Sequence, residues 1–314
     1  MFRNKMNNFL DIKKINKIDL RKILKDAKKR KLKRKTLNTL ESDTDKPLKG
    51  KLLIQMFEKS SLRTRLSFYI AIKQLGGSAL TLKAEELHLK KGEESIEDTA
   101  KIISSYADAF MFRTKNEKNL KEFSNNLTIP LINGLSPKSH PAQILSDIFT
   151  IEEIKKKSIS KLNICWIGDA NNVLNSLIEA SVKFSFNLSV GCPKQFMPDK
   201  TLIKWVKRNN KRFKIYNDPK HAIIDADILL TDKVISMNDK VNKKNKLKKF
   251  KKFTINEKLL RNTKKNLIIL HCLPRGKEIS EKIFQINKKN IWLQAFNRIC
   301  VQKSILLYCF GKLR

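Results

Sequence analysis

The chain has 314 residues, enough for two globular domains with separate hydrophobic cores. Hydrophobic residues make up 41% of it, but no apolar run approaches the length of about 18 residues that predicts a membrane-spanning helix. The first residues lack the apolar core of a secretory signal, so we expect a cytoplasmic protein. Its five cysteines are scattered without paired metal-ligand spacing, which indicates reduced thiols rather than disulfides or a zinc site.

The formal net charge of +37 would by itself favour a polyanion-binding protein. Lysine stands in place of arginine almost throughout, and Asn and Ile are abundant, as A/T-rich codon usage produces without selection for binding. The basic tract at 28–35 continues a helical pattern that begins at Leu20, Ile23 and Leu24, so we interpret it as a solvated helix face. We therefore expect no nucleic-acid partner and no membrane partner.

Apolar strand-like runs alternate with helical stretches along the chain, a pattern typical of parallel sheets flanked by helices. In chain order the predicted elements are a helix at 18–34, a strand at 52–57, a helix at 64–75, a helix at 95–106, a strand at 109–113, a helix from near residue 140, and strands at 162–167, 227–231 and 267–271. Gly76 and Gly77 end the second helix, and Ser95 to Asp98 resembles a capping box.

The predicted fold class is α/β, with two domains that are each a parallel sheet flanked by helices, joined by linking helices. A lysine-rich stretch before the strand at 162–167 places the boundary near residue 150. The predicted parts are residues 1–150, residues 151–290, and a C-terminal helix at 291–314 that returns to the first domain. A second lysine-rich tract, 240–252, is predicted to be an exposed loop or helix face.

The segment 57–65 follows an apolar strand and opens a helix, a geometry that binds anions. Backbone N–H groups, the hydroxyls of Ser61 and Thr64, and the guanidinium groups of Arg63 and Arg65 could together hold a phosphate. The alternative is that Ser61 only caps the helix and that both arginines are solvated.

This segment resembles the F-E-K-x-S-T-R-T-R motif of the aspartate/ornithine carbamoyltransferase family. The resemblance implies that Ser61, Leu62, Arg63 and Thr64 bind the phosphate of carbamoyl phosphate. Leu62 departs from the usual threonine, which keeps a backbone N–H but removes a hydroxyl. His88 resembles a residue of a loop that reaches the neighbouring subunit's site, since the family is trimeric.

Three further segments resemble the carbamoyl-phosphate half of the family's site: Phe112-Arg113-Thr114, the H-P-A-Q run from His140 to Gln143, and the N-R-x-x-x-Q-K run from 297 to 303. By resemblance, Arg113, His140 and Gln143 contact the carbamoyl group, and Arg298 lies beside carbamoyl phosphate. Attack on a carbonyl builds negative charge on its oxygen, which fixed donors stabilise. Taken singly, Arg113 could be an ion-pair arginine and His140 a core histidine. Phe296 replaces the family's glutamate, which removes a possible charge partner of Arg298 or Lys303.

Two loops in the second half leave the carboxyl ends of predicted strands, at 166–173 and 231–237, where open parallel sheets bind ligands. The first lacks a second glycine at dinucleotide-motif spacing, which disfavours a Rossmann dehydrogenase. Both resemble the ornithine-binding loops of the family, which implies that Asn172, Asp232, Ser236 and Met237 bind ornithine. The alternatives are that Asn172 caps its helix and that Asp232 is a solvated turn residue. Val234 and Asn238 replace the family's tryptophan and glycine in the second loop.

His271-Cys272-Leu273-Pro274 matches the H-C-L-P of ornithine-using members, whereas aspartate-using members typically carry H-P-L-P. The resemblance implies that Cys272 and Leu273 contact carbamoyl phosphate and the amine, and that Arg113, His140 and Cys272 are catalytic. The alternative for Cys272 is plain packing.

The implied reaction is transfer of the carbamoyl group of carbamoyl phosphate to the side-chain amine of L-ornithine, which gives citrulline and phosphate in arginine biosynthesis. No metal or organic cofactor is expected, and the implied assembly is a homotrimer with active sites at subunit interfaces. Three alternatives stay open: a carbamoyltransferase for putrescine or acylated ornithine, a degenerate basic homologue, and a basic RNA- or DNA-binding protein.

Overall fold

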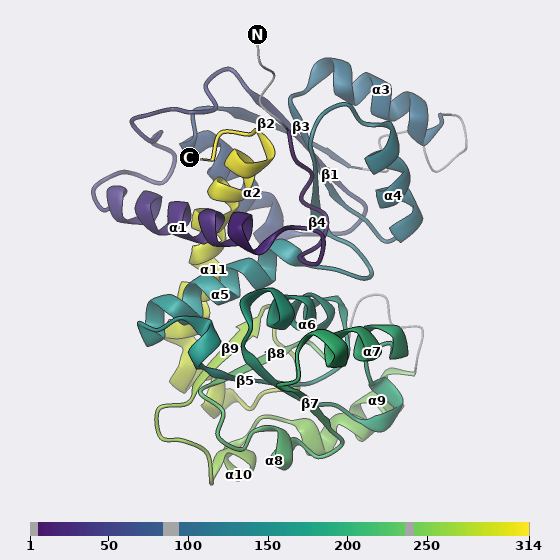
Figure 1. Cartoon of the computed structure of the whole chain (residues 1–314), viewed down its shortest axis with the longest axis vertical. Coiled ribbons are helices and arrows are strands. Elements are labelled where there is room, and N and C mark those ends of the chain that lie inside the picture. The colour runs from purple at the N-terminus through teal and green to yellow at the C-terminus, as the bar shows by residue number, and fades with distance from the viewer. Residues whose placement is uncertain (1–5, 84–93, 236–241, 314) are drawn as a thin grey trace. The chain divides into compact units, whose positions relative to one another are not determined.

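The computed structural model describes residues 6–83, 94–235 and 242–313, which form two compact units (Figure 1). Unit 1 comprises Met1–Ser146 and Asn297–Arg314, and unit 2 comprises Asp147–Phe296. Each unit contains a parallel sheet flanked by helices, so the predicted α/β class is confirmed. Helices α5 (Pro141–Lys155) and α11 (Glu281–Cys309) each contain one boundary, so the chain passes between the units within helices.

Unit 1 contains a four-stranded sheet in the order β2-β1-β3-β4. The strands are β1 (Leu52–Phe57), β2 (Ser78–Lys83), β3 (Ala109–Arg113) and β4 (Leu131–Leu135), and the helices are α1 (Lys17–Lys33), α2 (Leu62–Gln74), α3 (Ile96–Tyr106) and α4 (Glu117–Asn126). Alternate residues of β1 and β3, such as Met56 and Phe110, pack against α3 and α4, which lie side by side (Figure 1). Phe110 contacts Phe123 of α4 with ring centroids 5.2 Å apart, and such buried aromatics carry much of this core.

Unit 2 contains a five-stranded sheet in the order β7-β6-β5-β8-β9. The strands are β5 (Asn163–Ile167), β6 (Asn187–Gly191), β7 (Phe213–Tyr216), β8 (Ile228–Asp232) and β9 (Ile268–Cys272). The helices are α6 (Asn172–Phe184), α7 (Lys200–Asn209), α8 (Pro219–Ala222), α9 (Lys243–Phe250) and α10 (Glu257–Leu260), with 3-10 turns η3 (Ile159–Lys161), η4 (Lys194–Phe196) and η5 (Lys251–Phe253). On one face of the sheet, Cys165 and Leu229 pack against residues of α8, α9 and α11 in one apolar cluster.

Local sequence explains where several helices begin and end. Ser95 accepts a hydrogen bond from the Asp98 N–H at 3.0 Å, so its predicted role as the N-cap of α3 is confirmed. The Asp98 carboxylate accepts from the Ser95 hydroxyl, whereas a complete capping box would use the Ser95 backbone N–H. Gly76 follows α2 with φ of +86°, a left-handed conformation that glycine adopts without strain. The carboxyl ends of β1, β3 and β5 lead through short connections into the N-termini of α2, α4 and α6.

The strands predicted from the sequence are all present with ends within one residue, but β2, β4, β6 and β7 were not predicted. Edge strands β2 and β7 are largely half-buried or exposed, and β4 and β6 contain Asn and Gly, so none reads as a continuous apolar run. Two helix boundaries were also wrong. Helix α2 begins at Leu62 rather than Thr64, and the C-terminal helix begins at Glu281 rather than at 291.

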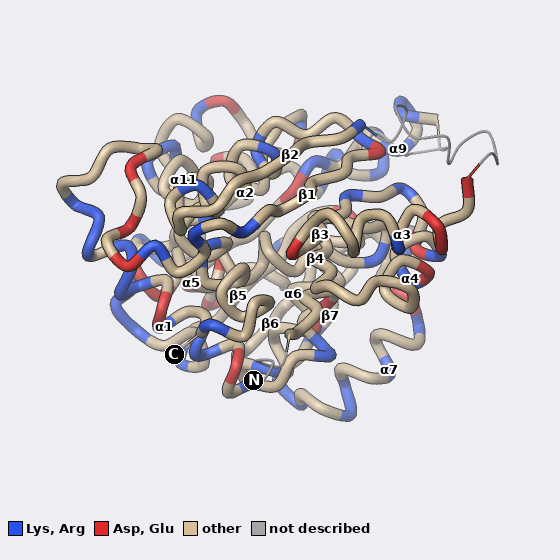
Figure 2. The backbone as a smooth tube through the Cα atoms, turned by 90° about the horizontal axis from the view of Figure 1, so that it is seen from above, with Lys and Arg blue, Asp and Glu red and all other residues tan. Residues whose placement is uncertain are grey.

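Lys and Arg occur along the helices and loops of both units rather than in one element (Figure 2). Of the basic tract at 28–35, Lys28 and Lys29 are exposed as predicted, whereas Arg30 and Arg34 are largely buried in ion pairs with carboxylates. Among the described residues, no helix is both long enough and apolar enough to cross a membrane.

Candidate active site

The N-terminus of α2 and the end of β3 form one half of the candidate site, in unit 1. Strands β1 and β3 are adjacent and parallel, with Phe57 opposite Arg113, so the residues that follow both strands emerge at the same sheet edge. Ser61 is the N-cap residue of α2 in extended conformation, yet its hydroxyl caps no backbone N–H among the described residues. The alternative that Ser61 serves as a side-chain cap is therefore wrong, and free N–H groups remain at this helix start.

Thr64 links the residues predicted to bind carbamoyl phosphate. Its hydroxyl oxygen accepts from Arg298 Nη2 at 2.8 Å and from Arg113 Nη1 at 3.3 Å. Arg298, which is 2% exposed, also donates to the side-chain oxygen of Gln143. The structure thus brings together Thr64, Arg113, Gln143 and Arg298, which lie far apart in the sequence, and places Arg63 in the same first turn of α2.

His140 lies buried beside these cations, immediately before α5. Burial lowers its pKa well below the ordinary histidine value, and the positive charges of Arg298, Arg113 and Arg63 lower it further. The imidazole is therefore neutral at physiological pH. A neutral imidazole can donate one hydrogen bond to a developing oxyanion, while the arginines supply the positive charge.

Glu58 holds the loop that follows Arg113, a role that sequence reasoning did not find. Its carboxylate accepts from the Thr114 hydroxyl at 2.7 Å and from the Lys115 N–H at 2.6 Å. Asn119 donates to the other oxygen at 3.4 Å. Because Glu58 follows β1 and Thr114 follows β3, this carboxylate ties the two loops of the phosphate half together.

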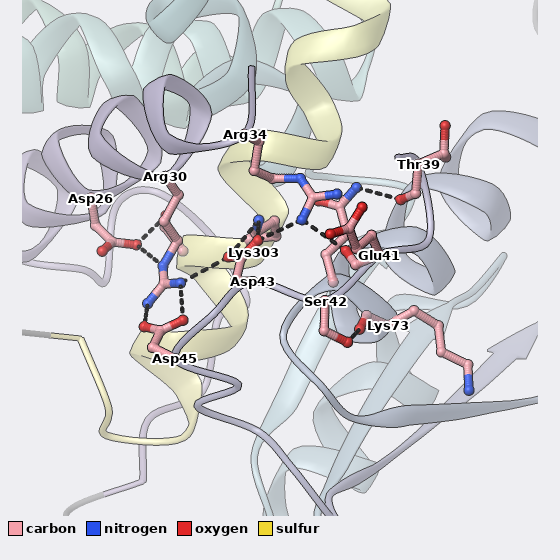
Figure 3. A network of polar contacts seen from close by, with 12 residues as sticks. Asp26, Arg30, Arg34, Thr39, Glu41, Ser42, Asp43, Asp45, Lys73 and Lys303 are labelled. Atoms are coloured by element: carbon pink, nitrogen blue, oxygen red, sulfur yellow. Dashed lines mark hydrogen bonds and ion pairs between the residues drawn. The ribbon is translucent and has the colours of Figure 1, made fainter. Parts of the chain in front are cut away.

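The part of α11 that carries Arg298 is held by an ion-pair network (Figure 3). Lys303, 1% exposed, contacts both oxygens of the Asp43 carboxylate at 2.7 Å, and Arg30 and Arg34 donate to the same carboxylate. We had expected the loss of glutamate at position 296 to cost Arg298 or Lys303 a charge partner. The structure shows that Lys303 is paired with Asp43 instead.

Asp232 lies at the carboxyl end of β8 in unit 2, directly opposite Cys272 across the β8–β9 ladder. Asn171 donates to its carboxylate at 2.8 Å. Burial raises the pKa of Asp232 to about 6, although this hydrogen bond and the nearby His271 oppose the rise. Asp232 is therefore not a simple solvated turn residue. At neutral pH its carboxylate is charged, and its present contacts do not fully offset the free-energy cost of burying that charge.

Asn171, rather than Asn172, caps helix α6. Its side-chain oxygen accepts from the Val173 and Leu174 N–H groups at 3.0 and 3.1 Å, while its amide nitrogen donates to Asp232. The alternative in which Asn172 is the cap is wrong, because Asn172 is the first residue of the helix itself. The sequence contains two adjacent asparagines, and only the backbone conformation distinguishes them.

His271 precedes Cys272 and forms a second buried contact that the sequence did not predict. Its Nε2 lies 2.8 Å from the Glu278 carboxylate, and both side chains are almost completely buried. Although burial alone would raise the pKa of Glu278, hydrogen bonds from His271 and from the Gly276 N–H lower it. Val234, at the position of the family's tryptophan, is buried and directs its N–H toward the same carboxylate at 3.4 Å.

Cys272 and Leu273 lie at the carboxyl end of β9 and are partly exposed.

Four residues singled out from the sequence, namely His88, Ser236, Met237 and Asn238, lie outside the described residues. The described residues contain no group of three or more His, Cys, Asp or Glu side chains with metal-binding geometry, and the five cysteines are free thiols.

Comparison with known proteins agrees with this geometry. Residues 7–153 match the model of the carbamoyl-phosphate-binding domain of aspartate/ornithine carbamoyltransferases, and residues 160–309 match that of the Asp/Orn-binding domain. An ornithine carbamoyltransferase of Rhodopseudomonas palustris is 38% identical, covering 99% of each chain.

Solved structures give the same result. The anabolic ornithine carbamoyltransferase of Campylobacter jejuni superposes with a TM-score of 0.89 at 33% identity, covering 97% of this chain and 99% of the other. The ornithine carbamoyltransferase of Pyrococcus furiosus gives a TM-score of 0.89 at 35% identity, covering 98% of both chains. This chain therefore belongs to the aspartate/ornithine carbamoyltransferase family, and it is a carbamoyltransferase.

Proposed function

We propose that this carbamoyltransferase uses L-ornithine, and that it forms citrulline and phosphate from carbamoyl phosphate and ornithine in arginine biosynthesis. One observation carries the choice of amine: Asp232, Asn171 and Cys272 meet at the carboxyl edge of the unit 2 sheet. The relatives that match nearly the whole chain are named ornithine carbamoyltransferase, which supports the proposal.

In the proposed reaction, Ser61, Leu62, Arg63 and Thr64 bind the phosphate through backbone N–H groups, hydroxyls and a guanidinium group. Arg113, His140 and Gln143 contact the carbamoyl group, and Arg298 balances the charge of the bound anion. The uncharged δ-amine of ornithine attacks the carbonyl carbon and negative charge builds on the oxygen. The carbon–oxygen bond to phosphate then breaks, and the departing phosphate takes up the proton that the attacking nitrogen loses. Donors that are fixed before the reaction lower this barrier without reorganisation. The proposed reaction requires no metal or organic cofactor, because carbamoyl phosphate is already an activated acyl donor and the arginines of the site supply the positive charge.

In the amino-acid half, Asp232 pairs with the α-ammonium of ornithine, while Asn172, Ser236 and Met237 complete its binding. Cys272 and Leu273 contact the δ-amine and the carbamoyl group. A cation beside Asp232 would offset the desolvation that raises its pKa to about 6. Nα-acylated ornithine has lost the charge of its α-nitrogen, so it would not supply this cation, whereas putrescine keeps a second ammonium group and lacks only the α-carboxylate. The Asp232 carboxylate therefore favours free ornithine over acylated ornithine, and comparison of turnover with the two amines distinguishes ornithine from putrescine.

We further propose a cytoplasmic homotrimer in which His88 reaches a neighbouring subunit's site. Leu62 and Leu66, one turn apart on α2, are 70% and 48% exposed in the single chain, which is an apolar surface that a second copy could cover. The five free thiols suit a reducing compartment.

The test is to incubate the purified protein with carbamoyl phosphate and, in turn, ornithine, putrescine, Nα-acetylornithine and aspartate. We expect citrulline and phosphate in equal amounts with ornithine, and much lower turnover with the other three amines. Greater turnover with any of the other three would reassign the substrate. Absence of turnover with all four would support the degenerate homologue, and steeply salt-dependent RNA or DNA affinity would then favour the nucleic-acid-binding alternative.

A further inference from the structure

Lys246 is the exception in the lysine-rich tract at 240–252, which we had predicted to be exposed. Its neighbours on α9, including Lys244 and Lys248, are exposed, whereas the Lys246 side chain is only 3% exposed. Its ammonium group lies 2.6 Å from the Asp169 carboxylate and 5.4 Å from the centre of the Phe196 ring. The prediction of an exposed face was wrong for this residue, because the sequence does not show which lysine of the tract faces the core.

Asp169 belongs to the β5–α6 loop, residues 168–171, which also carries Asn171. The Asp169 carbonyl accepts from the Asn171 N–H at 3.0 Å, so the two residues form one tight turn. Asn171 in turn donates to the Asp232 carboxylate at 2.8 Å. Lys246 is therefore connected to Asp232 through Asp169 and Asn171, by three short polar contacts within unit 2.

Stability alone does not account for this pair. Lysine is rarely buried unless it is paired, and replacing a buried ion pair by apolar side chains of similar volume is often neutral or stabilising. Lys246 lies against Phe196, whose ring packs on Phe250 with centroids 5.0 Å apart, so an apolar side chain would fit its surroundings. An apolar side chain at position 246 could not, however, orient the Asp169 carboxylate or the turn that follows it.

We propose that Lys246 and Asp169 are a positioning pair that fixes the β5–α6 loop, so that Asn171 and Asp232 are held in place for the α-ammonium of the amino-acid substrate. This inference rests on the proposed function and deepens it, because it assigns substrate affinity to a residue outside the substrate-binding loops. Neither residue touches the reacting atoms. The pair acts on binding of the amino acid and leaves binding of carbamoyl phosphate unaffected, because the residues assigned to the phosphate lie in unit 1.

The test compares steady-state kinetics of wild type with Lys246→Met, Asp169→Asn and the double variant. Methionine keeps an unbranched side chain against Phe196 and removes the charge. We expect the ornithine KM to rise about tenfold in each single variant, as loss of a charge-assisted contact implies. The KM for carbamoyl phosphate should stay within about twofold. The double variant should be no worse than either single variant, because the two side chains act as one unit.

Lys248→Met on the exposed side of α9 is the matched control, and it should leave both KM values unchanged. If the wild type uses ornithine and Lys246→Met has an unchanged ornithine KM, the positioning role is refuted. The proposed function is not affected by that result. Equal losses for both substrates with a lowered Tm would also refute it, in favour of a structural role. If Lys246→Met does not fold, the nearly isosteric Asp169→Asn decides by the same criteria. A wild type that makes no citrulline would overturn the proposed function and this inference together.

Discussion

Replacing Asp232 by asparagine should raise the free energy of unfolding and, at the same time, weaken binding of ornithine. Burial raises the pKa of Asp232 to about 6 in the folded state, against a value of 3.8 for an unperturbed aspartate. The folded state therefore binds its proton more tightly than the unfolded state. The contribution of this group to stability is fully present below pH 4 and is lost as pH rises through about 6.

The size of the effect follows from the difference of about two pKa units. At 1.36 kcal/mol per unit, ionisation of Asp232 costs up to about 3 kcal/mol of folding free energy above pH 6. Asparagine keeps the size of the side chain and an oxygen that can accept from Asn171, but it carries no charge. We expect Asp232→Asn to raise the free energy of unfolding by about 1–3 kcal/mol at pH 7.5 and to match wild type near pH 4.

The assay is urea unfolding of wild type and Asp232→Asn at several pH values from 4 to 8, combined with steady-state kinetics at pH 7.5. The ornithine KM should rise at least about tenfold, and the loss with Nα-acetylornithine should be smaller because its α-nitrogen is an uncharged amide. If the difference in free energy of unfolding between wild type and Asp232→Asn does not change with pH, the raised pKa of the Asp232 carboxylate is refuted. Equal kinetic losses with both amines would refute the recognition role.

Three other substitutions test separate parts of the structure. Arg63→Ala should weaken carbamoyl phosphate binding by about 2 kcal/mol in calorimetric titration while leaving the circular dichroism spectrum unchanged, and an unaltered affinity would contradict the assignment. Asp43→Asn should lower the free energy of unfolding by about 3 kcal/mol, because three buried cations share its carboxylate, whereas Asp45→Asn, at 54% exposure, should cost less than about 1 kcal/mol. Similar losses in the two variants would show that burial does not decide the cost. Asn171→Ala should remove both a helix cap and the hydrogen bond to Asp232, so chemical denaturation should show a loss of about 1 kcal/mol and kinetics should show a higher ornithine KM.

The sequence predicted the central strands because strands buried on both faces are continuous apolar runs, as in β1 and β8. It did not predict strands such as β6, where Asn187 and Ser189 alternate with buried residues. It also predicted which side chains stand at the carboxyl ends of strands, because that position depends only on local order. Arg113 and Asp232 were found in this way.

The partners of those side chains were not predictable, because each pairing depends on the folded arrangement. Glu58 and Thr114 are 56 residues apart, and Lys303 and Asp43 are 260 residues apart. Glu278 is seven residues from His271, and the chain between them is a loop, so no helix or strand periodicity predicts their contact. A single sequence shows the charges that must be satisfied without showing which group satisfies them.

Two of the departures from the family motifs, Leu62 and Phe296, fall where this chain can do without the missing side chain. Leu62 is the first residue of α2 and is 70% exposed, so the helix start still offers the backbone N–H that an anion requires. Phe296 replaces a carboxylate, yet Arg298 is bonded to Thr64, and Lys303 has its counter-ion elsewhere in unit 1. A buried arginine or lysine costs several kcal/mol when unpaired, so the fold requires both pairings whether or not the site is active. What argues for a working phosphate site is that Arg298 is held by Thr64 in the first turn of α2, beside the free backbone N–H groups that an anion would bind.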